Sequence, residues 1–481
     1  MSALAQPFGD LNALLRAHAA CGPERPALRE GDRVVTYGAL DARLDRIAAG
    51  MQGQGVTPGM RVSICGANSI DYAIVMLAAL RAGGIPALIP PSVTEAARAA
   101  MIADAAPVLA FDEAGIADPP TADAPPRTFE PAPADGFNII YSSGTTGAPK
   151  GIVQPWSMRW AHMQRGPSYG YDERSVTLLS TPLYSNTTLV SFYPALAAGG
   201  CVQLMARFDP AAYLGIAQEQ RVTHTMLVPA QYQRLMAFEG FDRHDLAAFR
   251  MKLSTSAPFH APLKQQVLDR WPGGLVEYYG MTEGGATCVL WAHVDRDKLD
   301  TVGKAAPGVE VRLVDEGGRE VPEGEAGEVV GRSGAMMTGY HNRPLETAEA
   351  EWFDGAGQRY IRTGDVGRLD GQGFLKLVDR RKDMIISGGF NVYPSDLEAV
   401  LRAHPGVRDV AVVGVASDRW GETPVAFVVP QGRLDAQVTR DWANERLGKL
   451  QRLHAVRVVD ELPRSAIGKV LKRELRDRYR D

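Results

Sequence analysis

The sequence predicts an α/β protein with a large N-terminal domain, residues 1–380, and a smaller α+β C-terminal domain, residues 381–481. Three observations support this fold class. Strands alternate with helices in two runs before residue 280, short strands and turns dominate after about residue 305, and a separate alternation begins near residue 383. The two runs predict two doubly wound α/β layers, and the short strands predict a β-barrel-like subdomain in the same domain.

The first run keeps a regular βαβ order. The expected elements are a strand at 61–65, a helix at 69–81, a turn at Gly83-Gly84, a strand at 85–89 and a helix at 94–105. This order is typical of right-handed parallel βαβ units. The next segment, 117–135, is rich in Pro, Ala and Asp, and it predicts a loop between the two layers.

The second run repeats the alternation. Its expected strands are 176–179, 223–228, 252–254 and 276–279, with helices at 231–238 and 262–271. Ligands of such sheets bind beyond the carboxyl ends of the strands. The segments 141–151 and 280–283 each follow a strand, so one site can use both.

The rest of the chain is built from shorter elements. Strands are expected at 309–314 and 327–331, around a Gly317-Gly318 turn, which indicates an antiparallel barrel or sheet. In the C-terminal domain we expect strands at 407–415 and 424–429 and helices at 395–404 and 437–448.

The composition excludes several classes of protein. The 481 residues are 45% apolar, enough for buried cores, and the formal net charge of -4 argues against a general nucleic-acid or anionic-membrane binder. The four cysteines form no metal-binding pattern and are expected to be reduced: Cys21, Cys65, Cys201 and Cys288. Residues 1–16 lack the pattern of a leader, and the longest apolar run, 72–80, is too short to span a bilayer. We therefore expect a soluble cytoplasmic protein.

The segment Tyr141-Ser-Ser-Gly-Thr-Thr-Gly-Ala-Pro-Lys-Gly151 predicts a polyphosphate cradle. It follows an apolar strand at 137–141 and combines unobstructed backbone N–H groups with hydroxyl donors and one ammonium group. The residues expected to contribute are Ser142, Ser143, Gly144, Thr145, Thr146, Gly147 and Lys150. Pro149 before the lysine and Gly151 after it exclude a Walker A loop. A flexible linker is the alternative, but a linker needs neither the strand nor Pro149 and Lys150.

Four further segments accompany this loop in one known family. They are Tyr279-Gly-Met-Thr-Glu283, Arg362-Thr-Gly-Asp365, Asp379-Arg-Arg-Lys-Asp383 running into Ile385-Ile-Ser-Gly-Gly-Phe-Asn391, and Pro463-Arg-Ser-Ala-Ile-Gly-Lys469. With these motifs the chain resembles the acyl-adenylate-forming superfamily of acyl-CoA synthetases, peptide-synthetase adenylation domains and beetle luciferases. The matching segments cover most of the chain.

The resemblance implies roles for the nucleotide site. Tyr279 would stack on adenine, Thr282 would contact the α-phosphate and Glu283 would hold Mg. Asp365 would bind the ribose hydroxyls, with Arg380 as a second contact. Taken alone, the segment 279–283 has the alternative of a core tyrosine with a solvated glutamate. The alternative for the segment that ends at Asp365 is an ordinary turn.

The resemblance also implies that the C-terminal domain is mobile. Lys382 would be the hinge residue, Gly388 and Gly389 would border the pantetheine arm of CoA, and Lys469 would bridge the acid's carboxylate and the α-phosphate. An exposed linker at 379–383 and a β-bulge at the glycines are the alternatives. The basic tail, 472–480, is more typical of a solvated helix face.

The expected reaction uses ATP, Mg and coenzyme A. A carboxylate attacks the α-phosphate to give acyl-AMP and pyrophosphate, positioned by Lys469, Lys150 and Thr282, and a thiol then displaces AMP. No motif supplies a base for the thiol. Free CoA is the favoured acceptor, with carrier-protein loading second and luciferase-like oxidation third. A non-enzymatic nucleotide sensor is the alternative from another class.

The acid is predicted from two segments. In Pro182-Leu-Tyr-Ser-Asn-Thr-Thr188, Ser185 departs from the aromatic residue that the family commonly carries, and with Asn186 and Thr187 beside it the pocket is expected to be polar. Tyr184, Ser185 and Asn186 are the residues of this segment expected to contact the acid. Tyr278 would shorten the pocket, while Gly280 leaves room at its base. We expect a short, branched or hydroxylated acid, with a compact aryl or medium-chain acid as the alternative. The partner is then a small acid, with no nucleic acid or stable membrane association, and the protein is a monomer or homodimer.

Overall fold

The computed structural model describes residues 3–142, 149–380, 383–387, 390–417, 420–448, 451–465 and 468–480. Contacts divide the chain into two compact units. Unit 1 comprises Met1–Glu310 and Gly331–Ile361, and unit 2 comprises Val311–Val330 and Arg362–Asp481. The predicted domain boundary at residue 380 stays a prediction.

The larger sheet of unit 1 has nine strands in the order β14-β13-β12-β11-β10-β8-β9-β1-β2. Its neighbours from β12 to β1 run parallel, and antiparallel strands close both edges. In sheet order the strands are Lys304–Ala305, Cys288–Trp291, Gly274–Tyr279, Met251–Ser254, His224–Leu227, Val176–Leu179, Cys201–Leu204, Pro26–Glu30 and Arg33–Thr36. The predicted second α/β run is thereby confirmed.

The second sheet of unit 1 has six strands in the order β17-β7-β6-β4-β3-β5. In that order they are Gly339–Tyr340, Lys150–Pro155, Gly136–Ser142, Ile85–Ile89, Arg61–Cys65 and Leu109–Phe111. Strands β3, β4, β5 and β6 are parallel, whereas β7 returns antiparallel to β6 and pairs with β17. The two strands of the predicted βαβ unit, β3 and β4, are therefore parallel neighbours in this sheet.

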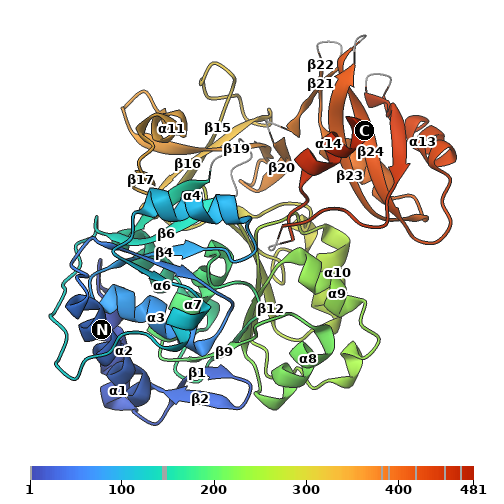
Figure 1. Ribbon diagram of the computed structural model, residues 1–481. Helices are drawn as coiled ribbons and strands as arrows, with labels where there is room; N and C mark the ends of the chain where they lie inside the picture. The colour runs from blue at the N-terminus through green and yellow to red at the C-terminus, as the bar shows by residue number, and fades with distance from the viewer. Residues whose placement is uncertain are drawn as a thin grey trace. The chain divides into compact units, whose positions relative to one another are not determined.

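Helices of unit 1 fill the space between its two sheets and cover their outer faces (Figure 1). Helix α3 contacts β3 and β4 of one sheet and β1 of the other, while α6 packs on β6 and β7 and against α7, which lies on β8, β9 and β10. The helices of unit 1 are α1 Leu11–Cys21, α2 Tyr37–Gly53, α3 Ile70–Arg81, α4 Glu95–Ala105, α5 Glu113–Ala117, α6 Trp156–Gln164, α7 Asn186–Ala197, α8 Pro210–Glu219, α9 Pro229–Met236, α10 Ala261–Arg270 and α11 Pro344–Glu349. Both sheets thus bury the faces that their apolar sequences predict.

Two of the predicted helix starts are capping residues. Ser69 and Thr94 precede α3 and α4, and each side chain accepts a hydrogen bond from the backbone N–H three residues later. A hydroxyl in this place satisfies a donor that has no partner within the helix. The expected helices at 69–81 and 94–105 are therefore confirmed, with their first residue at the cap.

Unit 2 contains a five-stranded sheet in which β24 pairs with β21, β23 and β25. Its strands are β21 Ile385–Ser387, β22 Phe390–Val392, β23 Val407–Ser417, β24 Gly421–Pro430 and β25 Ala455–Val458, and its helices are α12 Pro394–Arg402, α13 Ala436–Asn444 and α14 Lys472–Arg480. Successive residues of β23 enter two different cores: Val410 and Val412 join one, Ala411 and Val413 the other. This alternation is the period of a strand buried on both faces.

The predicted short strands after residue 305 are confirmed. They belong to another five-stranded sheet, ordered β15-β16-β19-β18 with β20 beside β19, and the chain passes between the two units within β15, β16 and β19. These strands are β15 Val309–Val314, β16 Gly327–Ser333, β18 Glu351–Phe353, β19 Arg359–Leu369 and β20 Leu375–Arg380. The fold class is α/β, with a large N-terminal domain and a smaller C-terminal one, as predicted. No helix among the described residues has the length and apolar character needed to cross a bilayer.

Gly303 should be a sensitive position for stability. Its φ is +86°, and a Cβ there would lie 2.0 Å from the carbonyl oxygen of Val289 on β13. We expect Gly303→Ala to lower the free energy of unfolding by about 3 kcal/mol or more, because backbone strain and overpacking each cost about 1–3 kcal/mol. Gly308→Ala is the control, since its φ is +74° but the added methyl meets open space. Equal losses in urea unfolding would contradict this account.

Candidate active site

Three segments of unit 1 leave the nine-stranded sheet at the same edge. Strands β8, β10, β11 and β12 run parallel, so the segments that follow β8, β11 and β12 all begin at their carboxyl ends. They are 180–185, 255–256 and 280–283, and they include five of the residues predicted to bind the acid or the nucleotide: Tyr184, Ser185, Gly280, Thr282 and Glu283. The carboxyl edge of a parallel sheet is where such folds bind ligands.

The turn that carries Glu283 is anchored by backbone contacts. The N–H of Met337 donates to the carbonyl oxygen of Glu283 at 2.8 Å, and the N–H of Gly285 donates to that of Ala335 at 3.1 Å. Gly284 has φ +79°, and a Cβ on it would lie 2.0 Å from the Ala335 oxygen. Only glycine allows the segment around Ala335 to approach this closely.

Tyr340 joins two of the predicted catalytic residues. Its hydroxyl donates a 2.8 Å hydrogen bond to Glu283 Oε1, and the Lys150 ammonium lies 5.0 Å from the centroid of its ring. Burial, together with the nearby Glu283 carboxylate, raises the pKa of Tyr340, so the phenol stays a donor. The hydroxyl of Tyr340 thus holds a carboxylate, while its ring contacts a cation.

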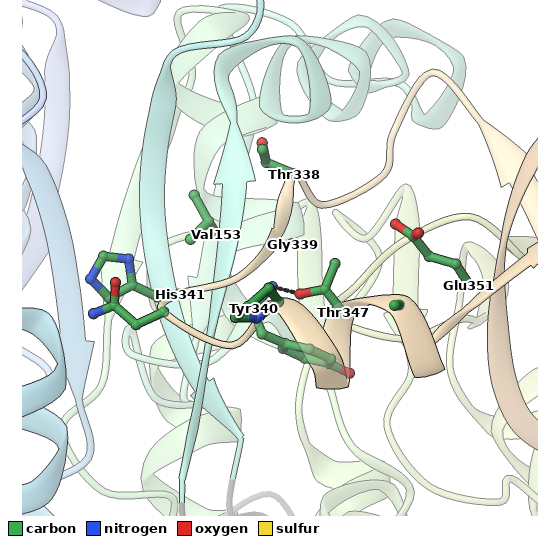
Figure 2. Close-up of a pocket in the computed structure, with 10 residues that line it drawn as sticks. Val153, Thr338, Gly339, Tyr340, His341, Thr347 and Glu351 are labelled. Atoms are coloured by element: carbon green, nitrogen blue, oxygen red, sulfur yellow. Dashed lines mark hydrogen bonds between the residues drawn. The ribbon is translucent and has the colours of Figure 1, made fainter.

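Helix α11 is hydrogen-bonded to the backbone of Tyr340 beside a hollow of the surface (Figure 2). The Thr347 hydroxyl of α11 accepts a 2.9 Å hydrogen bond from the Tyr340 N–H and donates one of 2.7 Å to Arg343 O. The hollow is lined by Val153, Thr338, Gly339, Tyr340, His341, Asn342, Pro344, Thr347, Ala348 and Glu351. Helix α11 therefore fixes the strand from which Tyr340 reaches Glu283.

Gln154 connects the two sheets of unit 1 at the same turn. From β7 its Nε2 donates to the carbonyl oxygen of Thr282 at 2.7 Å and to Asn186 Oδ1 at 3.4 Å. Gln154 is fully buried. Neither Tyr340 nor Gln154 was predicted from the sequence, and the one available signal was a polar residue inside the apolar strand 152–155.

Hydroxyl groups surround the start of α7. Ser185 is its N-cap and accepts from the N–H of Thr187 at 3.3 Å, and the Thr187 hydroxyl is hydrogen-bonded to that of Ser256. Ser256 has φ +81°, a left-handed conformation that is rare outside glycine. It was not predicted either, although it lies two residues after the end of β11. Tyr184 is half-buried, and burial raises its pKa.

Aromatic rings pack behind Tyr278, a residue predicted to line the acid pocket. The Tyr169 ring meets Tyr278 edge-on at 5.4 Å between centroids, and Tyr169 stacks on Trp291 at 5.3 Å. Burial raises the pKa of Tyr278. Gly280 is exposed, and the nearest atom to an added Cβ would be Ala286 O at 3.5 Å, so there is space beside it.

The two residues predicted to bind ribose lie together in unit 2. Asp365 and Arg380 are opposite one another on β19 and β20, and Arg380 Nε lies 2.9 Å from Asp365 Oδ1. The Thr363 hydroxyl accepts from the N–H of Asp365 at 3.0 Å and donates to Val329 O at 2.9 Å. The Arg362–Asp365 motif thus lies within β19, where these bonds hold it, with Gly364 at φ +70°.

Lys469 lies on a braced turn of unit 2. The N–H of Ser465 donates to Lys469 O at 2.8 Å, and the N–H of Lys469 donates to Ser465 Oγ at 3.2 Å. Arg464 pairs with Asp409 at 2.6 Å and donates to Gly468 O at 2.7 Å. These bonds fix the backbone from which the lysine projects.

Several predicted residues lie outside the described residues: Ser143, Gly144, Thr145, Thr146, Gly147, Lys382, Gly388, Gly389 and the side chain of Ser142. In the part of the chain that is described, no group of three or more His, Cys, Asp or Glu side chains forms a metal cluster. Mg²⁺ bound to a nucleotide needs only one or two protein carboxylates, because phosphates and waters complete its octahedron. Glu283 fits that donor set.

Comparison with known proteins gives a consistent result. The AMP-binding enzyme family matches residues 15–341, and the AMP-binding enzyme C-terminal domain matches residues 396–469. Feruloyl-CoA synthase of Amycolatopsis sp is 35% identical over 95% of this chain and 96% of the relative. Indoleacetate–CoA ligase of Aromatoleum aromaticum is 32% identical over 97% and 98%.

Two solved structures are similar along the whole chain. ATP-bound MatB from Rhodopseudomonas palustris has a TM-score of 0.88 and 27% identity, covering 98% of this chain and 99% of that one. O-succinylbenzoate coenzyme A synthetase (MenE) from Bacillus subtilis, in complex with ATP and magnesium ion, has a TM-score of 0.85 and 26% identity, covering 97% and 99%.

Tyr340→Phe tests the contact between Tyr340 and Glu283. The ring and its packing remain, but Glu283 loses its 2.8 Å donor. If Glu283 holds Mg²⁺, the Mg²⁺ concentration that half-saturates pyrophosphate release should rise roughly tenfold, as for other partners of metal ligands. Tyr360→Phe is the matched control, because Tyr360 donates to Glu310 in the same way at 2.7 Å. An equal shift in both variants, or none in either, would show that the contact is only structural.

Proposed function

This chain belongs to the AMP-binding enzyme family, and on that premise we propose that it is a carboxylic acid–CoA ligase that works through an acyl-adenylate. It is an AMP-forming acyl-CoA synthetase, and enzymes of this kind use ATP, Mg²⁺ and CoA. The observation that supports the assignment most directly is the arrangement around Tyr340. A carboxylate suited to Mg²⁺ and a lysine suited to phosphate contact the same side chain.

In the first step the acid's carboxylate oxygen forms a bond to the α-phosphorus, and the bond from that phosphorus to the bridging oxygen of pyrophosphate breaks. Lys150 and Thr282 orient the phosphates, and Lys469 stabilises charge on the carboxylate and the α-phosphate. Bound Mg²⁺ would neutralise phosphate charge, with Glu283 as its ligand. Tyr279 contacts adenine, and Asp365 with Arg380 binds the ribose.

In the second step the thiol of CoA loses its proton to solvent as its sulfur bonds to the acyl carbon, and AMP leaves with the electrons of the carbon–oxygen bond. Lys469 is not needed there, so we propose that a C-terminal domain, 381–481, moves about Lys382 after the first step. Gly388 and Gly389 then admit the pantetheine arm. The assignments at residues 143–147, 382, 388 and 389 are supported by the motifs alone.

For the acid we propose a compact aryl acid, the alternative to the short hydroxy acid favoured by the sequence. Two of the polar groups that suggested a hydroxylated acid have partners within the protein. Ser185 caps α7, and Asn186 accepts from Gln154. The aromatic group of Tyr278, Tyr169 and Trp291 and the names of the relatives, feruloyl-CoA synthase and indoleacetate–CoA ligase, support an aryl substrate. The short, branched or hydroxylated acid stays a prediction.

A panel of acids tests the substrate class. Pyrophosphate release would be measured with ferulate, benzoate, hydroxyisobutyrate, butyrate and palmitate, with and without CoA. We expect kcat/KM for the best aryl acid to exceed that for palmitate and hydroxyisobutyrate by at least about tenfold, because misfit in a shaped pocket costs about 1–3 kcal/mol. Hydroxyisobutyrate as the best substrate would restore the short-acid prediction. ATP binding without any turnover would favour the nucleotide sensor.

Lys469→Ala separates the two half-reactions. We expect acyl-AMP formation to fall by about 100-fold or more, since one transition-state donor is worth that much, while thioester formation from supplied acyl-AMP is kept. Arg473→Ala, at an exposed cation on α14, is the control and should leave both steps unchanged. Equal loss of both half-reactions in Lys469→Ala would refute the separate roles.

A further inference from the structure

Arg159 is a buried cation with neutral partners. It lies on α6 and is fully buried, and burial lowers its pKa only to about 10, so it remains charged at neutral pH. Its Nε donates to Asn138 Oδ1 at 2.9 Å and its Nη2 donates to Gln154 Oε1. Its guanidinium carbon lies 5.5 Å from the centroid of the Tyr193 ring. Both hydrogen-bond acceptors are side-chain amides, so the charge is solvated by dipoles.

These bonds fix the orientation of two amide groups. A guanidinium only donates, so each amide must turn its oxygen toward Arg159. Asn138 Nδ2 also donates to Gln154 Oε1 at 3.0 Å, which closes a ring of three side chains on β6, β7 and α6. With its oxygen held twice, Gln154 can present only its NH₂ group to the other side.

That NH₂ group contacts both halves of the candidate site in unit 1. It donates to Thr282 O, one residue before Glu283, and to Asn186 Oδ1, at the first residue of α7. Thr282 belongs to the nucleotide motif and Asn186 to the segment predicted to line the acid pocket. A flipped Gln154 amide would place its oxygen against the carbonyl oxygen of Thr282, which can only accept, and would break that bond; Asn186 could keep its bond only by rotating its own amide.

We propose that Arg159 is a positioning residue, which locks the Gln154 amide so that one NH₂ group holds the nucleotide turn at Thr282 and the acid-pocket helix at Asn186. This inference rests on the proposed function. It makes ATP binding and acid binding depend on one buried charge that touches neither substrate.

Three variants test the lock. Arg159→Met removes the donors that orient Gln154, so KM should rise for both ATP and the acid, and kcat/KM should fall roughly ten- to hundredfold, the scale of one or two lost hydrogen bonds. Gln154→Glu keeps the shape and pairs with Arg159 but cannot donate to Thr282 O. Asn186 can rotate its amide and donate to the new carboxylate, so this variant should raise KM mainly for ATP. Arg159→Lys should recover part of the activity lost in Arg159→Met.

Comparing the unfolding midpoint with the two KM values distinguishes a positioning role of Arg159 from a role in packing alone. Arg159→Met leaves the buried Asn138 oxygen without its donor, a cost of about 1–3 kcal/mol, so in a chain of this size the unfolding midpoint should stay within a few degrees of wild type. Tyr213→Phe, which removes a buried 2.7 Å bond to Thr225, is the control and should leave both KM values unchanged. If Arg159→Met does not fold, Gln154→Glu carries the test alone.

Wild-type KM values in Gln154→Glu and Arg159→Met would overturn the proposal. So would losses of kcat/KM in these variants that parallel losses of stability. Calorimetric titration with ATP measures the binding affinity of each variant without turnover. This measurement therefore does not depend on the proposed reaction. If the wild type released no pyrophosphate with any acid, the function would be refuted. Weaker ATP binding by Gln154→Glu than by wild type would still support the lock, and equal binding would refute it.

Discussion

The candidate site of unit 1 depends on one constraint, the attachment of the Tyr279–Glu283 turn to the six-stranded sheet. The turn leaves β12 of the nine-stranded sheet, yet its carbonyls and its carboxylate are bonded by groups from β7, β17 and residues 335–337. A loop at the end of a single strand would be free to move by an ångström, which is enough to misplace a phosphate ligand. Here two sheets define its position.

This attachment explains why polar groups are buried between the sheets. Gln154 and Asn138 are fully buried, and each has hydrogen-bond partners that offset the cost of leaving water. An apolar interior would pack as well, but it could not hold the carbonyl oxygen of Thr282. The polar network therefore stabilises the fold less than apolar side chains would, but it fixes the position of the turn. The two glycines after Glu283 have the same effect on the other side of the turn.

The fold was predictable where local periodicity decides it. The helices after Ser69 and Thr94, the strand pair β3 and β4, and the alternating cores of β23 all follow from side-chain spacing and capping. Placement of Tyr279, Thr282 and Glu283 at a strand exit was predictable for the same reason. Tyr340 was not, because it lies 57 residues beyond Glu283 and meets it only through the pairing of β17 with β7. Ser256 and Arg159 were missed likewise, since no local pattern encodes the hydrogen bonds that a helix residue makes with a strand or loop outside its own helix.

The acid-binding side shows how such contacts change an interpretation. From sequence alone, Ser185, Asn186 and Thr187 read as a polar pocket wall. In the structure Ser185 caps a helix, Asn186 accepts from Gln154 and Thr187 bonds to Ser256, whose left-handed backbone costs about 1–3 kcal/mol. Groups engaged in this way define the shape of the wall more than they offer hydrogen bonds to a ligand. In the function we propose, selection of the acid rests on the aromatic rings near Tyr278, and apolar contacts of that kind discriminate by only about 10- to 200-fold per misfitting methylene. An enzyme that selects its acid by shape should accept a series of related aryl acids with graded efficiency.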